Sequence, residues 1–212
     1  MSDERLLQQI EFINEVEKLK LVTRHNVVID NHRPENSAEH SWHIALMAIV
    51  LLEHADLENI DLLRVLKMLI LHDLVEIYAG DTWIYDEAGS ASQHERELEA
   101  AHKLFSLLPS DQKSTFLSLW LEFEARESDD AIFAASIDTL QPLQNRWITT
   151  PPDAGIEPPT TQQVINKKKH IADASSKLWQ YAQQVIKKSA EAGFYTIDSS
   201  FADRHKHESS SD

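Results

Sequence analysis

The 212-residue sequence predicts an all-α fold, a single bundle of about six to seven helices. Apolar residues recur at the 3.6-residue period of amphipathic helices, and no convincing stretch alternates apolar and polar residues as a half-buried strand does. Only 4 glycines are present, widely spaced, which excludes Gly-rich phosphate-binding loops. The chain has no cysteine, so disulfides, thiol nucleophiles and Cys-containing zinc sites are excluded as well.

Three helices are predicted in the N-terminal part of the chain. The apolar face of the first helix is made by Leu6, Ile10, Ile13 and Val16. The second helix begins after Asn36, which can form a capping box with Glu39, and runs to about His54. The third helix is capped by Asp61 and continues to Ala79, where a glycine follows.

Three further helices and one long C-terminal helix complete the predicted bundle. The fourth and fifth cover residues 92–108 and 110–127 and are separated by a proline. The sixth covers residues 129–140, because Pro142 lies at or just past its end. After a Pro-rich surface loop at 151–159, the last helix runs from about residue 160 to 192.

Charge and hydropathy restrict the possible partners and the location of the protein. Asp and Glu number 35 against 20 Lys and Arg, so the formal net charge is -15, a sign that repels nucleic-acid polymers and anionic membranes. The N-terminus lacks the basic and apolar regions of a signal peptide, and no apolar run approaches the roughly 20 residues of a membrane span. We expect a cytoplasmic domain over residues 1–198, with its core at about 3–147, and a disordered tail at 199–212.

Several ionisable side chains lie in helical segments that are otherwise apolar. They are His40, His72, Asp73 and Asp138. An unpaired carboxylate is costly to bury, and a divalent cation shared by all four would compensate them, since imidazole and carboxylate suit Zn, Fe, Mn or Co. The alternative is that each is a hydrogen-bonded core residue or a helix cap. Glu76 and Asp81 favour the metal site, because they bring four ionisable groups into ten residues of an apolar segment.

Two other metal motifs are incomplete. His94 and Glu95 begin a zincin-like H-E-x-x-H sequence, but Leu98 occupies the position of the second histidine. Glu99 and His102 match the E-x-x-H sequence of di-iron bundles, but a second copy is missing. Both segments are more typical of a solvated helix face.

The spacing of His40, His72, Asp73 and Asp138 resembles the H…HD…D signature of the HD-domain superfamily of metal-dependent phosphohydrolases. Two longer segments, RPENSAEHS at 33–41 and HDLVEIYAGD at 72–81, are similar to the YfbR-type 5′-nucleotidases and the related HD domain-containing protein 2 family. The similarity extends from the first helix to Leu140. The resemblance implies a single HD-domain helical bundle.

The resemblance also implies a role for individual residues. His40, His72, Asp73 and Asp138 would hold one divalent metal ion, which could be Mn, Co, Fe, Zn, Ni or Mg. Arg24 would contact the substrate phosphate. Arg33 is a second candidate for this contact, and the alternative is that it is a charge on the surface of a loop. Glu76 and Asp81 would orient or deprotonate water and assist the leaving group. His25 stands where some bacterial members have a bulky aromatic residue near the sugar, so the preference between deoxy and ribo substrates stays open.

These features predict a phosphomonoesterase that hydrolyses (deoxy)nucleoside 5′-monophosphates to nucleoside and phosphate. A hydrolase of cyclic or polyphosphorylated nucleotides would use the same metal ligands, and a non-catalytic nucleotide-binding HD module is the alternative from another class. We expect a homodimer, because symmetric dimers are the commonest soluble assemblies and the family tends to form them.

Overall fold

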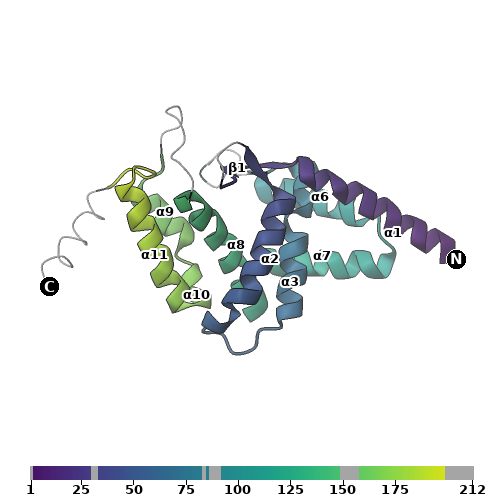
Figure 1. Ribbon diagram of the computed structural model, residues 1–212. Helices are drawn as coiled ribbons and strands as arrows, with labels where there is room; N and C mark the ends of the chain where they lie inside the picture. The colour runs from purple at the N-terminus through teal and green to yellow at the C-terminus, as the bar shows by residue number, and fades with distance from the viewer. Residues whose placement is uncertain (1, 30–32, 83–84, 86–91, 149–157, 199–212) are drawn as a thin grey trace, which may run out of the picture.

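The computed structural model describes residues 2–29, 33–82, 85, 92–148 and 158–198. Helices dominate this part of the chain (Figure 1), so the prediction of an all-α fold is confirmed. Most of the predicted loop at 151–159 and the whole predicted tail lie outside the described residues. Among the described residues, no helix combines the length and the apolar character needed to cross a bilayer.

The N-terminal part forms two helices joined by a short hairpin. Helix α1 (Ser2–Val16) continues into the 3-10 helix η1 (Glu17–Leu21). Strand β1 (Thr23–Val27) then pairs antiparallel with β2 (Pro34–Asn36), a pairing that the sequence analysis missed. Helix α2 (Ser37–Leu51) begins with the predicted capping box. The hairpin therefore sets β1 beside the first turn of α2.

The third predicted helix is divided at the most polar part of its sequence. The 3-10 helix η2 (Leu52–His54) ends the preceding segment, and α3 (Leu62–Leu71) begins at the predicted aspartate cap. The chain then tightens into the 3-10 helix η3 (His72–Val75) before α4 (Glu76–Ala79), so the prediction of one continuous helix was wrong. The Trp120 indole N–H donates to the backbone carbonyl oxygen of His72 at 3.2 Å, and the Glu76 amide instead reaches the Asp73 carbonyl oxygen.

Helix α8 runs through the middle of the molecule. It follows α6 (Gln93–Phe105) and α7 (Ser110–Ala125), extends over Asp129–Ile148, and packs against α2, α3 and α7. The predicted end near residue 140 was wrong, since Pro142 lies inside the helix. A proline removes the amide that would bond to the carbonyl oxygen four residues earlier, here that of Asp138. Leu140, Gln141 and Leu143 are nearly or fully buried, and this packing carries the helix past the proline.

The predicted C-terminal helix is three helices in the structure. They are α9 (Thr161–Lys168), α10 (Ile171–Ala174) and α11 (Ser176–Glu191), and both α10 and α11 pack on α8. The prediction of one continuous helix was wrong because Ser175 is extended, with φ -161° and ψ 116°. Its side chain accepts a hydrogen bond from the Leu178 amide and so starts a new helix.

Candidate active site

Three elements bring the four predicted metal ligands together. His40 lies in the first turn of α2, His72 and Asp73 lie on η3, and Asp138 lies on α8. The distance from Asp138 Oδ1 is 2.9 Å to His40 Nε2 and 3.6 Å to His72 Nε2. His72 Nε2 is 2.9 Å from Asp73 Oδ1. Ligand atoms of His40, His72 and Asp73 all lie within 4.8 Å of one another, so these three side chains could hold a metal ion, and Asp138 lies beside both imidazole rings.

The hydrogen bonding and the pKa of His72 indicate that the cluster of predicted ligands attracts a cation. Its Nδ1 lies 2.9 Å from the backbone carbonyl oxygen of Leu69 and donates to it, which leaves the lone pair of the neutral ring on Nε2. This Nε2 atom is buried and makes no hydrogen bond of acceptable geometry within the described chain, although two carboxylates lie near it. Burial lowers the pKa of His72, but Asp73 and Asp138 outweigh burial and raise the pKa well above its usual value. The cluster therefore attracts positive charge, and its donor set suits a divalent metal ion.

A buried glutamine orients the other histidine. His40 is fully buried, and its Nδ1 lies 3.0 Å from Gln141 Oε1. Gln141 Nε2 donates to Glu35 Oε1 at 2.8 Å, so the amide oxygen of Gln141 faces the ring and accepts from Nδ1. The lone pair of the neutral His40 ring is then on Nε2, toward Asp138.

Replacing Gln141 with alanine should lower the affinity for a divalent metal about 10- to 100-fold, because residues that orient a metal-binding histidine usually have effects of this size. Isothermal titration with Mn²⁺ alone measures the change. Gln144→Ala is the matched control, one turn further along α8, where the side chain bonds to Tyr181 at the surface. Equal affinities of the Gln141→Ala and wild-type proteins would contradict this role.

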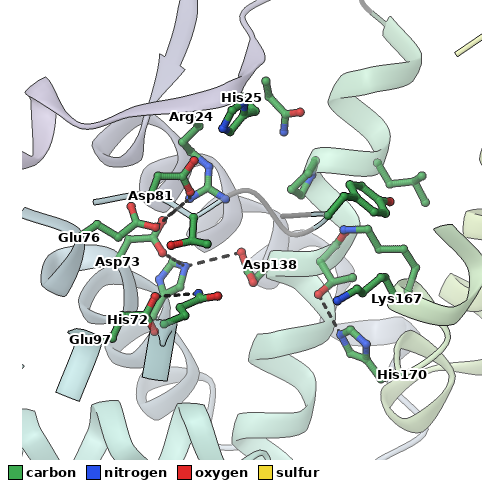
Figure 2. A pocket seen from close by; sticks show the side chains of 18 of the residues that line it. Arg24, His25, His72, Asp73, Glu76, Asp81, Glu97, Asp138, Lys167 and His170 are labelled. Atoms are coloured by element: carbon green, nitrogen blue, oxygen red, sulfur yellow. Dashed lines mark hydrogen bonds and ion pairs between the residues drawn. The ribbon is translucent and has the colours of Figure 1, made fainter. Parts of the chain in front are cut away.

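Arg24 joins the cluster from strand β1. Its side chain is 14% exposed, and its Nη1 atom lies 2.7 Å from Asp73 Oδ2. The same nitrogen is 3.9 Å from Glu76 Oε1 and 3.9 Å from Asp81 Oδ1. One guanidinium group thus faces three acids, one on η3, one on α4 and one just after α4, as Figure 2 shows.

The two acids that follow the His-Asp pair are held differently. Glu76 Oε2 accepts a hydrogen bond of 2.6 Å from the hydroxyl group of Ser37, which leaves Oε1 toward Arg24. Burial and the neighbouring Asp73 charge raise the pKa of Glu76 to about 9. Asp81 follows Gly80, whose φ of 76° is a conformation that favours glycine. This turn directs the chain from α4 so that Asp81 faces the same cavity.

The cluster opens into one cavity of about 500 Å³.

A sequence model of the HD-domain family matches residues 16–179. The chain belongs to the HD-domain family. A protein from Magnetospirillum magnetotacticum, described as a predicted metal-dependent phosphohydrolase, has a crystal structure with a TM-score of 0.82 and 41% identity, covering 91% of this chain and 98% of that one. An HD-domain phosphohydrolase from Listeria innocua has a TM-score of 0.55 over 85% of each chain, but at 12% identity it shows the fold alone.

Relatives named 5′-deoxynucleotidase match a shorter part of this HD domain. The human protein named 5′-deoxynucleotidase HDDC2 is 33% identical over 133 residues, which are 62% of this chain and 63% of that protein. A 5′-deoxynucleotidase from Erwinia tasmaniensis is 31% identical over 128 residues, 57% of this chain and 64% of that protein. The chain thus spans less than two thirds of the length of these relatives.

Of the two other predicted substrate-binding residues, His25 lies at the cavity and Arg33 does not. His25 is exposed and lines the cavity, next to Arg24 on β1. Arg33 is outside the described lining of the cavity, and its guanidinium group pairs with Glu39 at 2.6 and 2.8 Å. Because this pair lies at the surface, the structure argues against Arg33 as a phosphate ligand.

Four residues of the HD site have no counterpart in the sequence analysis. They are Glu35, Ser37, Glu97 and Gln141, all buried polar side chains. Glu97 lines the cavity, and burial raises its pKa. Gln141 follows Asp138 by three residues, and this spacing on one helix face was a signal that could have identified it.

Proposed function

We propose that this HD domain is a metal-dependent phosphomonoesterase that hydrolyses nucleoside 5′-monophosphates to nucleoside and phosphate. The observation that carries the proposal is the position of Arg24, which faces Asp73, a proposed metal ligand, and two further acids inside one cavity. A phosphate dianion needs positive charge in an acidic protein, and a metal ion beside Arg24 would supply it. The relatives named 5′-deoxynucleotidase support the substrate class.

His40, His72, Asp73 and Asp138 would hold the metal ion. A bound divalent ion lowers the pKa of its water toward about 7 and polarises a phosphoryl oxygen. A set of two imidazoles and two carboxylates accepts several metals, so Mn, Co, Fe, Zn, Ni and Mg all stay candidates. The protein contributes the fixed spacing of the ligands from three elements and the orientation of both rings.

The side chains of the cavity then act on the substrate. Arg24 would turn one N–H from Asp73 toward the phosphate, whose oxygens match its planar donors. Glu76 Oε1 would orient the attacking water and accept its proton, since Ser37 holds Oε2. Positive charge at the neighbouring ligands lowers the pKa of Glu76 and so favours the ionised form that a base requires. Asp81 would assist the departing 5′-oxygen by donating a hydrogen bond or a proton.

Phosphate release from a panel of nucleotides tests this function. The purified protein with added Mn²⁺ or Co²⁺ is expected to release phosphate from nucleoside 5′-monophosphates and to leave 3′-monophosphates, cyclic nucleotides and triphosphates intact. Turnover of cyclic or polyphosphorylated nucleotides alone would favour the alternative hydrolase. Binding of 5′-monophosphates without turnover of any nucleotide would favour a non-catalytic module. A comparison of phosphate release from the deoxy and ribo forms of each compound would show which sugar the site beside His25 accepts.

The homodimer is part of the same proposal. Trp42, Leu46, Ile49 and Val50 follow one another on α2 at helical spacing and are 67%, 45%, 52% and 59% exposed. Leu6, Ile10 and Ile13 form a similar exposed stripe on α1. Large exposed apolar areas mark interaction surfaces, and a second copy of the chain would present the same apolar stripes. The cytoplasmic location stays a prediction from the sequence.

Ile49→Glu should shift the protein from dimer toward monomer, because two copies would bring buried carboxylates together. Light scattering coupled to size-exclusion chromatography measures the mass. Glu53→Gln, one turn further along the chain, provides a control with a small change at a polar position. A wild-type protein that is monomeric at all concentrations tested would contradict the dimer.

A further inference from the structure

The cavity lining also includes a group of basic residues, here called the basic wall. They lie at the end of α7, on α8 and at or just after the end of α9, namely Arg126, Arg146, Lys167, Lys168 and His170. One acid, Glu124, lines the cavity as well and interacts with Arg126. Figure 2 shows Lys167 and His170 on one side, the acids Asp73, Glu76 and Asp81 on the other, and Asp138 between them. The phosphate-binding role proposed for Arg24 belongs to the acidic side. The basic wall is therefore unused by the proposed mechanism.

Lys168 is the strongest indication of a missing anion. Its side chain lines the cavity, although the residue is only 6% exposed. Its ammonium group makes one long contact of 3.4 Å with the Thr139 carbonyl oxygen. No carboxylate oxygen of the described residues lies within 4 Å of it. An ammonium group has three donors, and a buried charge is normally paired, so this side chain lacks the partner that its burial requires.

Other positive charges near Lys168 make the lack of an anionic partner more unfavourable. Burial is the first cause that lowers the pKa of both Lys168 and His170. The Asp138 charge raises the pKa of Lys168, whereas the charges of Arg24 and Arg126 lower it. Arg126 ends α7 with φ 52° and ψ 40°, a left-handed conformation that residues other than glycine seldom adopt. Burial lowers the pKa of Lys168 to about 8, so the side chain is still mostly protonated at neutral pH. Arg126, Lys167 and Lys168 carry like charges, and gathering these charges is unfavourable unless an anion joins them.

We propose that Arg126, Lys167, Lys168 and His170 form a second anion subsite, which binds a phosphate of the substrate other than the one that is hydrolysed. The proposal rests on the proposed phosphomonoesterase function and narrows its substrate to a nucleotide with two separated phosphates, such as a nucleoside 3′,5′-bisphosphate. Water adds its oxygen to the 5′-phosphorus, the bond from phosphorus to the 5′-oxygen breaks, and the 5′-oxygen gains a proton. The second phosphate keeps all its bonds and contributes binding only.

A comparison of two substrates tests the subsite. We expect wild-type kcat/KM for deoxyadenosine 3′,5′-bisphosphate to exceed that for deoxyadenosine 5′-monophosphate at least about tenfold, mainly through a lower KM, because charge-assisted hydrogen bonds to a buried phosphate are strong. Lys168→Met should remove most of this preference. Lys169→Met is the matched control, since Lys169 is adjacent, exposed and outside the described lining of the cavity.

A second variant and a binding measurement test the subsite even if Lys168→Met fails to fold or the protein hydrolyses neither nucleotide. Arg126→Asn replaces an exposed side chain at a left-handed position that asparagine tolerates, and it should also reduce the preference if Lys168→Met fails to fold. Calorimetric titration of the metal-free protein with the bisphosphate reports on the subsite even if the protein hydrolyses neither nucleotide, which would overturn only the proposed function. Equal wild-type affinities for the two nucleotides, or the same preference in the Lys168→Met and Lys169→Met proteins, would overturn the subsite.

Discussion

Replacing Asp73 with alanine should abolish both metal binding and phosphate release. Asp73 Oδ1 lies 2.9 Å from His72 Nε2, and Asp73 Oδ2 lies 2.7 Å from Arg24 Nη1. The variant removes one of the four proposed ligands and releases the arginine from its closest carboxylate. Because a metal ion contributes several kcal/mol to transition-state stabilisation, kcat/KM should fall by at least about 10³-fold. Phosphate release and elemental analysis of the purified protein measure the two losses.

The control for Asp73→Ala must separate lost chemistry from lost folding. Breaking a buried ion pair by removing one partner can cost about 3–5 kcal/mol of stability, so thermal unfolding has to be followed as well. Asp73→Asn keeps the volume and an oxygen that can accept from Arg24, and it should fold where alanine does not. Asp173→Ala removes an exposed acid on α10 and should keep wild-type metal content and activity. Full phosphatase activity in metal-free Asp73→Ala protein would overturn the proposed metal site.

Local signals predicted where most helices begin. Helix α2 starts at the capping box of Asn36 and Glu39, and α3 starts at the cap residue Asp61. These starts could be predicted because a cap depends only on residues that are close in the sequence. The divisions of the predicted helices depend on tertiary contacts. The contact between Trp120 and the His72 carbonyl oxygen joins residues 48 positions apart, and burial of the residues around Pro142 overrides its tendency to end a helix.

The charged residues of the site could be predicted and the neutral ones could not. Asp73 and Asp138 were conspicuous because a carboxylate in an apolar helix needs compensation. Ser37 and Gln141 are buried more deeply than these aspartates, but neutral polar residues fit many environments and do not need a compensating charge. Their roles depend on partners at sequence distances of 39 and 101 residues. Lys168 was missed for another reason: it lies in a run of three lysines that is typical of a solvated helix end.

The hairpin illustrates how much a small error in secondary structure affects the site. The sequence predicts no strand, and the segment around Arg24 leads into Pro34 with flanking Asn and Asp residues, which are typical of a loop. In the structure, Thr23 pairs with Asn36, the residue that caps α2. This pairing ties the Arg24 strand to the helix that carries His40. The position of Arg24 over the acids is therefore fixed by two backbone segments, which neither the charge pattern nor the helical periodicity indicates.

Replacing Glu76 with glutamine should stop turnover and leave metal binding intact. Glutamine has nearly the same volume, and its amide oxygen can still accept the hydrogen bond from Ser37, which is 2.6 Å long in the wild type. It cannot accept a proton from water at neutral pH. Loss of general base catalysis should lower kcat about 10²- to 10⁴-fold. Steady-state kinetics and Mn²⁺ titration calorimetry measure the two properties on the same preparation.

Asp73→Ala should lose both the metal ion and turnover, whereas Glu76→Gln should lose turnover alone. This difference distinguishes a metal ligand from a general base. Glu76 Oε1 lies 3.9 Å from Arg24 Nη1, and its other oxygen is held by Ser37, so neither oxygen belongs to the proposed set of four ligands on η3, α2 and α8. If Glu76→Gln loses metal and activity together, Glu76 is a ligand and the assignment of a base fails. If it keeps both, water is activated without Glu76. Retained metal with lost turnover is the single outcome that agrees with a proton acceptor held by Ser37 beside the metal ligands.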